Sequence, residues 1–415
     1  MRILHLSTFK RGGAGKSAVR LNNGLNNLNL SSKLGFKETS INLDQTEFTI
    51  PINLNFIQKV KFKLTDQLIE STFNKRLANR NEGFEKFSTI SSDYNILELR
   101  EYREADIVHL HWVADLLDFK TFFVKNLKPV VWSLCDLNPL TGGCHYPMDC
   151  NKFEFDCSNC PQLPKGKVNE IAKNQLQIKK NIHSSIKSKL HFVSPANWMD
   201  SQIAKSSFGA FQRSIIPHPS DESIYFSLDK VNAKIVNDLP LDKLIVLFAS
   251  ENLNNPRKGY QFFENLAREF INEPIVFLLI GHGSKLDNIK ENIITLDYII
   301  DERKLNEIYN ACDLVLIPSI QDNLPLTLID ANMAGTPVLT FSIGGANQWV
   351  KNGINGFKIG EATQINLVNS LKQILKNPGS IPSQEIVKNY ALKNFSKDSV
   401  AKMYRVLYQK LLSNM

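Results

Sequence analysis

The sequence has no long apolar run and little cysteine, and each absence excludes a class of protein. No stretch of its 415 residues approaches the roughly 18 consecutive apolar residues of a membrane-spanning helix. The first residues, Met1 to Leu6, form too short an apolar run for a secretory leader. Six cysteines are too few for a disulfide scaffold. These features predict a cytoplasmic protein, and a 43% apolar, 22% charged composition excludes a wholly disordered chain.

Positive charge is unevenly distributed along the chain. The net charge is +8, with an excess of nine positive charges in residues 1–216 and of one negative charge in residues 217–415. This indicates either an anionic partner for the first half, such as phosphate, a membrane face or nucleic acid, or a solubilising surface that needs no partner. Residues 56–77 leave a similar pair of alternatives open. Their basic amphipathic pattern fits a helix on an anionic membrane or a surface helix packed on its own domain.

Short apolar runs alternate with helical patterns along the whole chain. Runs that are apolar at consecutive positions are typical of strands buried on both faces, as in a parallel sheet covered by helices. Eight such runs predict strands at residues 3–6, 107–110, 130–132, 190–193, 244–249, 275–280, 314–317 and 338–341. A helix is predicted over 324–334, with Pro325 in its first turn and Gly335 just past its end. The pattern predicts an α/β protein with two Rossmann-like halves.

Proline marks the division between these halves. The stretch Ile216-Pro217-His218-Pro219-Ser220 is suited to a break between domains. We therefore expect a first domain over 1–216, a linker over 217–240 and a second domain over 241–396. Apolar residues at helical spacing predict a final helix over 397–415, with Ser396 as its N-cap.

A glycine-rich segment, Arg11-Gly12-Gly13-Ala14-Gly15-Lys16-Ser17, follows the first predicted strand. It ends in Gly-Lys-Ser as a phosphate-binding loop does, although Lys10 stands where the standard spacing needs glycine. One interpretation is a deviant P-loop ATPase that uses Arg11 to Ser17. The other is a turn at a helix N-terminus, where Gly12 and Gly13 offer bare backbone N–H groups to an acceptor or phosphate. No later apolar strand ends in a clear magnesium-binding aspartate, which favours the turn.

A second set of residues suits a diphosphate. Arg257 and Lys258 follow the predicted strand 244–249 and can supply cations. Gly281 follows the predicted strand 275–280, and its missing side chain lets the backbone approach a ligand closely.

The segment around the predicted helix 324–334 adds an anion site and two carboxylates. Near Asn323-Leu324-Pro325-Leu326 the helix presents unpaired N–H groups and the positive end of its dipole, which can hold a diphosphate. Asp322, ahead of the helix, can reach sugar hydroxyls. Asp330, about two turns in, can accept from a ribose diol.

Together and in this order, these residues resemble the donor-site signature of glycosyltransferase family 4. Here the signature is Pro318-Ser319, Asp322, Asp330 through Val338, and Gly344-Gly345, within a resemblance that spans about 240–360. Both family acids are normally Glu, so each Asp is one methylene shorter and lies closer to its ligand or reaches it through water. The resemblance implies the GT-B fold, in which two Rossmann-like domains with parallel sheets face a central cleft and a C-terminal helix crosses back to the first domain.

Three segments of the first half resemble the acceptor half of a polysaccharide-building branch of the same family. They run from Asp106 to Trp112, from Pro129 to Asp136 and from Thr141 to Tyr146. Where that branch has His then Asp, this chain has Cys135-Asp136, so Asp136 and His111 become the candidates for the catalytic group. The alternative for His111 is a hydrogen-bonded structural histidine, and a buried Cys135 behaves as a small hydrophobe.

Four of the six cysteines, Cys144, Cys150, Cys157 and Cys160, fall within 17 residues. Cys157 and Cys160 form a Cys-x-x-Cys pair, and four thiolates can hold a structural zinc ion that fixes a long loop. Disulfides and free thiols are alternatives that the spacing leaves open.

The resemblance implies a retaining glycosyltransferase of the hexosyltransferase class, with Lys258 and Asp322 at the reacting bond. Its donor would be a nucleoside-diphosphate sugar, bound by residues 241–396. Its acceptor, bound by residues 1–216, would be a glycan or a polyprenyl-diphosphate-linked oligosaccharide of a surface polysaccharide, at the inner face of the cytoplasmic membrane. No cofactor is required for catalysis and no nucleic acid is involved. The alternatives are the deviant P-loop ATPase and a zinc-dependent nucleic-acid-binding protein.

Overall fold

The computed structural model describes residues 1–39, 42–52, 77, 80, 83–166, 168–186, 189–283 and 291–413. The amphipathic segment 56–77 lies outside the described residues except for Leu77. The chain forms two compact units. Unit 1 comprises residues 1–195, 199–216 and 404–415, and unit 2 comprises residues 196–198 and 217–403.

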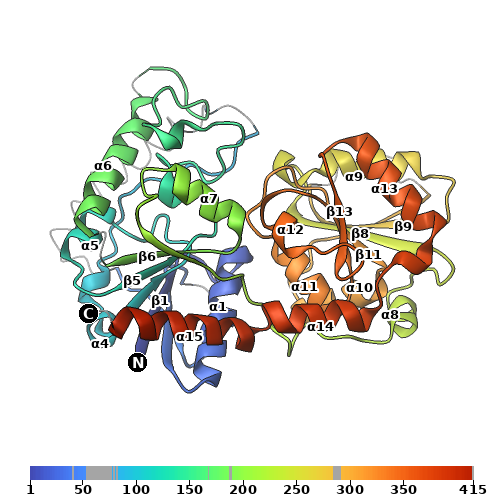
Figure 1. Ribbon diagram of the computed structural model, residues 1–415, viewed down its shortest axis with the longest axis horizontal. Helices are drawn as coiled ribbons and strands as arrows, with labels where there is room; N and C mark the ends of the chain where they lie inside the picture. The colour runs from blue at the N-terminus through green and yellow to red at the C-terminus, as the bar shows by residue number, and fades with distance from the viewer. Residues whose placement is uncertain are drawn as a thin grey trace. The chain divides into compact units, whose positions relative to one another are not determined.

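Unit 1 is built on a parallel sheet in the order β3-β2-β1-β4-β5-β6-β7, of which β1, β5 and β6 are labelled in Figure 1. The strands are β1 (Arg2–Ser7), β2 (Ser31–Phe36), β3 (Glu47–Thr49), β4 (Ile107–Leu110), β5 (Val130–Ser133), β6 (Leu190–Ser194) and β7 (Gln212–Ile215). The helices among the described residues include α1 (Gly12–Asn27), α4 (Arg100–Glu104), α5 (Phe119–Lys125), α6 (Glu170–Ile186) and α7 (Asn197–Lys205).

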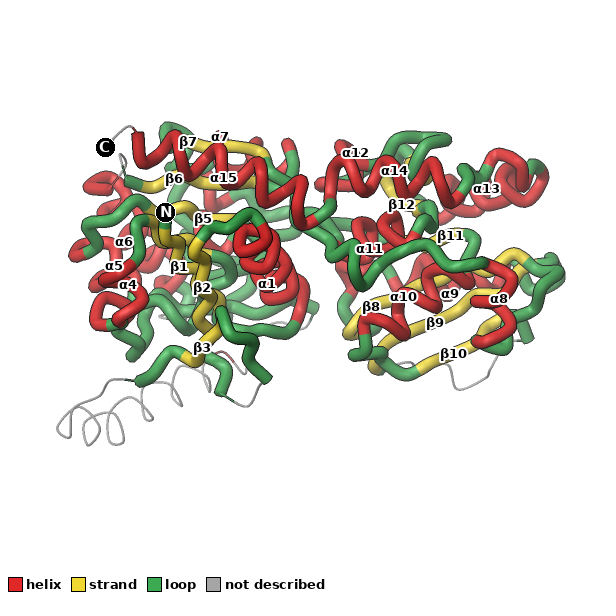
Figure 2. The backbone as a smooth tube through the Cα atoms, turned by 90° about the horizontal axis from the view of Figure 1, so that it is seen from below, coloured by secondary structure: helices red, strands yellow, loops and turns green. Residues whose placement is uncertain are grey.

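Unit 2 repeats the arrangement with a parallel sheet in the order β10-β9-β8-β11-β12-β13, whose first three strands lie side by side in Figure 2. The strands are β8 (Leu244–Asn252), β9 (Ile275–His282), β10 (Ile293–Leu296), β11 (Leu314–Ile317), β12 (Val338–Phe341) and β13 (Gly356–Ile359). The helices are α8 (Lys230–Val236), α9 (Tyr260–Glu269), α10 (Glu302–Ala311), α11 (Leu326–Ala334), α12 (Gly344–Trp349), α13 (Gln364–Lys376) and α14 (Gln384–Phe395).

The sheet of unit 2 is buried on both faces. Alternate residues of a strand point to opposite faces, so Ile245 and Leu247 join one apolar cluster while Val246 and Phe248 join the other. Helices α10, α11 and α14 supply the first cluster, and α9 and α13 supply the second. This double burial explains why the strand sequences are apolar at consecutive positions.

All eight predicted strands are confirmed, and so is the helix at 324–334, which runs from Leu326 to Ala334 with Pro325 as its N-cap and Gly335 as its C-cap. Both sheets are parallel and carry the strand order of a Rossmann fold, so the predicted fold class is confirmed. No helix in the described ranges is long and apolar enough to span a bilayer.

Residues 217–240, expected to form a linker, belong to unit 2. Helix α8 packs against α10, and Ala233 and Leu239 enter the core. Two cations of α8 bind Asp313 at the start of β11: Lys230 Nζ lies 3.0 Å from its Oδ1 and Lys234 Nζ lies 3.1 Å from its Oδ2. Pro217 and Pro219 indicated where the second unit begins, but they gave no sign of how the residues after them pack.

The C-terminal helix α15 (Lys397–Ser413) belongs to both units. Its first residues lie in unit 2, where Lys397 Nζ lies 2.6 Å from Asp221 Oδ1. Its later residues lie in unit 1, where the hydroxyls of Tyr404 and Tyr408 lie 2.6 Å from Ser133 Oγ and His109 Nδ1, respectively. The last helix therefore returns to the first unit, as predicted.

Candidate active site

The strand order of unit 2 reverses between β8 and β11, and the segments that follow these two strands meet. Ligands of open α/β sheets bind outside the carboxyl ends of the strands at such a switch point. The segment after β8 forms a short 3-10 helix, Pro256–Lys258, which is capped by the Asn255 side chain. The backbone N–H of Ile320, after β11, donates to the carbonyl of Arg257 at 2.9 Å.

Gly259 allows this close approach. Its φ is +77°, which suits glycine, and a Cβ atom there would lie 2.0 Å from the Pro318 carbonyl oxygen. The chain therefore needs glycine at this position to keep Lys258 beside the segment that carries Asp322.

Two cations converge on the carboxylate of Asp322. Lys258 Nζ donates to Asp322 Oδ2 at 2.6 Å, and Arg257 Nη1 lies 3.2 Å from the same oxygen. Arg257 also donates to the Gln321 carbonyl at 2.8 Å. The backbone N–H of Asn323 donates to Asp322 Oδ1 at 3.0 Å, so cations and amide lie in one cluster.

The charge balance of this cluster leaves one positive charge in excess. Burial by itself raises the pKa of Asp322, but Lys258, Arg257 and the hydrogen bonds hold that pKa below its ordinary value, so the carboxylate is ionised. Arg257 and Asp322 are buried, whereas the Lys258 side chain is 29% exposed. The Lys258 ammonium can therefore contact an incoming anion, while the buried Arg257 and Asp322 hold that ammonium in place.

Helix α11 starts beside this cluster. Its first turn follows Asn323-Leu324-Pro325, and the first N–H groups of a helix have no partner inside the helix. Two glycines close the turn from the other side: the N–H of Gly345 donates to the Asn323 carbonyl at 2.5 Å, and a Cβ at Gly344 would lie 1.7 Å from the Asp322 carbonyl. The turn is thus fixed by backbone contacts, which suits a preorganised anion site.

The other predicted donor residues have clear positions. Gly281 is the last residue but one of β9, with φ +153°, and a Cβ there would lie 2.1 Å from the Ser250 carbonyl oxygen of β8. Asp330 is 4% exposed and accepts from the Ser220 hydroxyl at 2.7 Å. One oxygen of Asp330 therefore binds the segment after the break between units, and its predicted contact with a ribose stays a prediction.

In unit 1 the glycine-rich segment is helical. Helix α1 begins at Gly12, whose φ is +72°, so Lys16 and Ser17 lie inside the helix. A P-loop needs these positions at the helix start, after a loop that encloses phosphate, so the ATPase alternative is not supported. Gly13 is exposed at the N-terminus of α1, and its predicted contact with acceptor or phosphate stays a prediction.

His111 belongs to a buried histidine cluster at the switch point of unit 1. His5 of β1 pairs in register with His109 of β4, and His5 Nδ1 lies 2.9 Å from His111 Nε2. Ligand-type nitrogens of the three rings lie within 4.8 Å of one another. Both nitrogens of His109 are bonded to hydroxyls, to Tyr408 at 2.6 Å and to Ser133 at 2.7 Å, so the group is a hydrogen-bond cluster rather than an open metal site. Burial lowers the pKa of His5 to about 3 and that of His109 well below its ordinary value, which keeps both rings neutral.

Asp136 is buried with three donors. Its Oδ2 lies 2.6 Å from His145 Nδ1 and accepts from Trp112 Nε1 at 2.7 Å, and its Oδ1 accepts from the Asn138 amide at 2.8 Å. His145 Nε2 in turn lies 2.9 Å from Ser88 Oγ. Burial raises the pKa of Asp136, but these partners hold it below its ordinary value. The Ser-His-Asp order resembles a hydrolytic triad, yet Ser88 is 2% exposed, so the chain fixes structure rather than presenting a nucleophile.

Sequence reasoning missed the partners of these residues. Ser88, His5 and Tyr408 carry no local motif, and they reach their partners, His145, His111 and His109, from distant parts of the chain. The predicted catalytic role of Asp136 and His111 stays a prediction, and the structure gives each a set of internal partners. The four clustered cysteines are free thiols that line one pocket of unit 1.

Comparison with known proteins agrees with this description of unit 2. Residues 243–377 match the family model described as Glycosyl transferases group 1. The matched segment contains Arg257, Lys258, Asp322 and Asp330.

Two curated relatives are known from Escherichia coli. The UDP-Gal:alpha-D-GlcNAc-diphosphoundecaprenol alpha-1,3-galactosyltransferase is 31% identical over 116 residues, which cover 25% of this chain and 30% of that protein. The putative colanic acid biosynthesis glycosyl transferase WcaC of strain K12 is 25% identical over 246 residues, 56% of this chain and 58% of that protein. The chain thus spans less than two thirds of the length of either relative. The family model and both relatives are named for the transfer of glycosyl groups.

Solved structures resemble the whole chain. Sucrose-phosphate synthase of Thermosynechococcus elongatus has a TM-score of 0.69 at 14% identity and covers 100% of both chains. Anabaena HepE, solved in complex with UDP and glucose, has a TM-score of 0.64 at 13% identity and covers 99% of both chains. The chain has the GT-B fold. Neither these comparisons nor the described residues support the nucleic-acid-binding alternative.

Proposed function

We propose that this protein is a retaining glycosyltransferase that uses a nucleoside-diphosphate sugar as its donor. The observation that carries the proposal is the cluster of Arg257, Lys258 and Asp322 beside the first turn of α11. It combines excess positive charge with helix N–H groups, which is the chemistry that a diphosphate needs. The match of residues 243–377 to the Glycosyl transferases group 1 family supports the same conclusion.

In the proposed reaction the bond between the anomeric carbon and the diphosphate oxygen breaks, and an acceptor hydroxyl forms the new bond on the same face of the sugar. The hydroxyl proton passes to the departing diphosphate. Charge grows on the diphosphate as it leaves, and Lys258, Arg257 and the helix end stabilise that charge. Asp322 holds the Lys258 ammonium in position. Its carboxylate can also accept a hydrogen bond from a sugar hydroxyl. Because these residues supply the positive charge, the proposed transfer requires no cofactor.

The proposed acceptor is a glycan or a polyprenyl-diphosphate-linked oligosaccharide in surface polysaccharide synthesis. Two relatives support this class: one is named for transfer to a GlcNAc-diphosphoundecaprenol and the other for colanic acid biosynthesis. The excess of nine positive charges in residues 1–216 suits an anionic acceptor. We place the acceptor with unit 1 and the protein at the inner face of the cytoplasmic membrane, and we assign it to family 4 on the signature described above.

The test is a transfer assay on the full chain. Nucleoside diphosphates and nucleotide sugars are first screened for an increase in melting temperature, because a donor that binds only the folded state stabilises it. With the selected donor, Lys258→Ala should lower kcat by about 100-fold or more, which is the usual loss of a group that stabilises developing charge. Lys304→Ala is the matched control, since that lysine lies on α10 of the same unit and pairs with Glu307. If Lys258→Ala and Lys304→Ala are equally active, the proposed role of the cluster is wrong.

A further inference from the structure

A long irregular stretch of unit 1 carries four of its cysteines. Between the 3-10 helix Asn138–Leu140 and α6, the described chain has one further 3-10 turn, Lys152–Glu154. Three non-glycine residues in it adopt positive φ angles: Met148 at 53°, Cys157 at 54° and Asn159 at 49°. Such conformations persist where surrounding contacts over-determine them, and a long loop without secondary structure in a compact domain needs a device that orders it.

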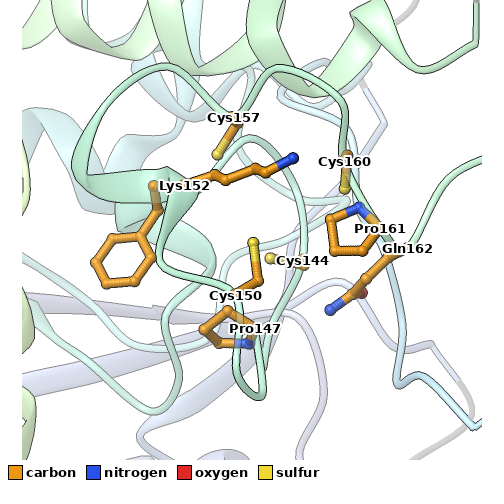
Figure 3. Close-up of a pocket in the computed structure, with 9 residues that line it drawn as sticks. Cys144, Pro147, Cys150, Lys152, Cys157, Cys160, Pro161 and Gln162 are labelled. Carbon is orange, nitrogen blue, oxygen red and sulfur yellow. The ribbon is translucent and has the colours of Figure 1, made fainter.

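The four cysteines surround one pocket. Cys144, Cys150, Cys157 and Cys160 line it together with Pro147, Phe153 and Pro161. Figure 3 shows their sulfur atoms directed toward the space that they enclose. Cys144, Cys157 and Cys160 are buried and Cys150 is partly buried, so the space is shielded from water.

Backbone donors approach two of the sulfur atoms. The N–H groups of Gly142 and Gln162 are directed toward the thiols of Cys157 and Cys160, respectively. Two further donors fix the backbone of the same residues: the Thr141 hydroxyl donates to the Cys144 carbonyl at 2.6 Å, and the Leu163 N–H donates to the Cys160 carbonyl at 3.3 Å. A donor directed at sulfur favours its charged form, but burial outweighs these donors and raises the pKa of Cys157 and Cys160 when no ion is bound.

A buried cation nearby has no carboxylate partner among the described residues. Lys179 of α6 is 1% exposed, and its Nζ donates to the carbonyls of Asn138 at 2.5 Å and Thr141 at 2.9 Å. Both carbonyls belong to the segment that leads into Cys144. Arg80 and Lys152 also lie at this loop, where Arg80 donates to Gln162 and Lys152 donates to the Asn159 carbonyl at 2.6 Å. A buried ammonium needs a counter-charge, and the groups around it point to an anionic centre in the cysteine loop.

We infer that Cys144, Cys150, Cys157 and Cys160 bind one structural zinc ion through four thiolates. A zinc ion with four thiolates carries two negative charges, which the three neighbouring cations offset. Among the described residues, the side chains already grouped as for a metal ion are His5, His109 and His111, and the four thiols are not. Tetrahedral zinc with bonds of about 2.3 Å holds its sulfurs about 3.8 Å apart, so the side chains close around the ion when it binds.

The consequence is structural rather than catalytic. Four thiolates fill the coordination sphere and leave no position for water or substrate. The ion fixes the loop whose first residues include His145, the partner of Asp136. This inference does not depend on the proposed transfer reaction, because the metal can be measured without a donor or acceptor.

The experiment is zinc analysis of the purified full chain, expressed in medium supplemented with zinc. We expect about one zinc per chain in the wild type and in Cys135→Ser, which removes a thiol outside the pocket. We expect little zinc in the double variant Cys157→Ser/Cys160→Ser. A chelator should lower the melting temperature of the wild type much more than that of the double variant.

A second measurement keeps the inference open to refutation if the double variant fails to fold. Cobalt added to the chelator-treated wild type should give the intense visible absorption of tetrahedral thiolate coordination, and zinc should displace it. Absence of zinc and of cobalt uptake would overturn the inference. Mass spectrometry without reduction provides the other refutation, since disulfides between these four cysteines would show that the loop is ordered by oxidation instead.

Discussion

The two units place different chemistry at equivalent points of the same fold. Each sheet reverses its strand order once, between β1 and β4 in unit 1 and between β8 and β11 in unit 2. In unit 1 the strands at this point carry the neutral, buried rings of His5 and His109. In unit 2 the segments beyond the strands carry Arg257, Lys258 and Asp322, with one positive charge in excess.

The difference shows that strand order fixes where a ligand can bind but not which ligand. Parallel strands bring the ends of distant segments together, and the residues that follow the strands then set the chemistry. The cations of unit 2 suit a diphosphate. The switch point of unit 1 is instead occupied by its own histidines and by tyrosines of α15.

Removing the buried Asp136 carboxylate of unit 1 should give the largest loss of stability. Asp136→Ala leaves His145 and the Trp112 indole without their shared acceptor, so we expect the free energy of unfolding to fall by about 3–5 kcal/mol. Urea unfolding measures the free energy of unfolding. Asp44→Ala is the control, because that carboxylate is exposed and its distance of 3.9 Å to Lys10 Nζ is long for an ion pair. Equal losses for the two variants would contradict the structural role of Asp136.

A glycine comparison tests the packing at the switch point of unit 2. Gly259→Ala both strains a left-handed backbone and places a Cβ against the Pro318 carbonyl, so we expect a loss of about 3 kcal/mol in stability. Gly353→Ala is the matched control, with φ +72° and no atom within 4 Å of the added Cβ, and it should cost about 1 kcal/mol. Gly259→Ala should also weaken nucleotide binding because Lys258 adjoins it. If both variants unfold alike, the close approach of these segments is not important.

Lowering the pH should destabilise unit 1 more than unit 2, with a smaller effect than the substitutions above. Every buried histidine in the described ranges lies in unit 1, and burial lowers the pKa of His5 and His183 to about 3. The unfolded chain protonates these rings near pH 6.5, so it binds more protons than the folded chain below that pH. The contribution is complete above pH 6.5 and is lost as the pH falls toward 3, by up to about 1.4 kcal/mol per pH unit for each histidine.

Hydrogen exchange at pH 7, 6 and 5 can resolve this effect by unit. We expect protection in unit 1 to fall over this range while protection in unit 2 changes less. The carboxylates do not obscure the result, because the pKa values of Asp136 and Asp322 lie below the ordinary 3.8. Equal loss in both units would show that the buried histidines do not control the pH response.

The sequence revealed the fold better than it revealed unit 1's polar interior. Strands buried on both faces are apolar throughout and were predictable, whereas β2, Ser31 to Phe36, contains Ser, Lys and Gly and was not. Lys258 and Asp322 were predictable because each follows a recognisable strand.

Contacts between distant polar residues carried no such signal. Asp330 was assigned to a ligand, yet it accepts from Ser220, 110 residues away. Asp136 was assigned to catalysis, yet it pairs with His145 and the Trp112 indole. Polar partners that meet only through the fold leave no periodicity in the sequence, so their pairing could not be predicted.

The diphosphate site of unit 2 can be tested by calorimetric titration of the full chain with the nucleoside diphosphate chosen by thermal shift, comparing Lys258→Ala with Lys16→Ala. We expect Lys258→Ala to weaken binding at least about tenfold, the effect of losing a charge-assisted contact of about 1.4 kcal/mol or more. Lys16→Ala, inside helix α1, should bind as the wild type does. Loss of binding in Lys16→Ala with wild-type affinity in Lys258→Ala would show that unit 2 does not hold the diphosphate.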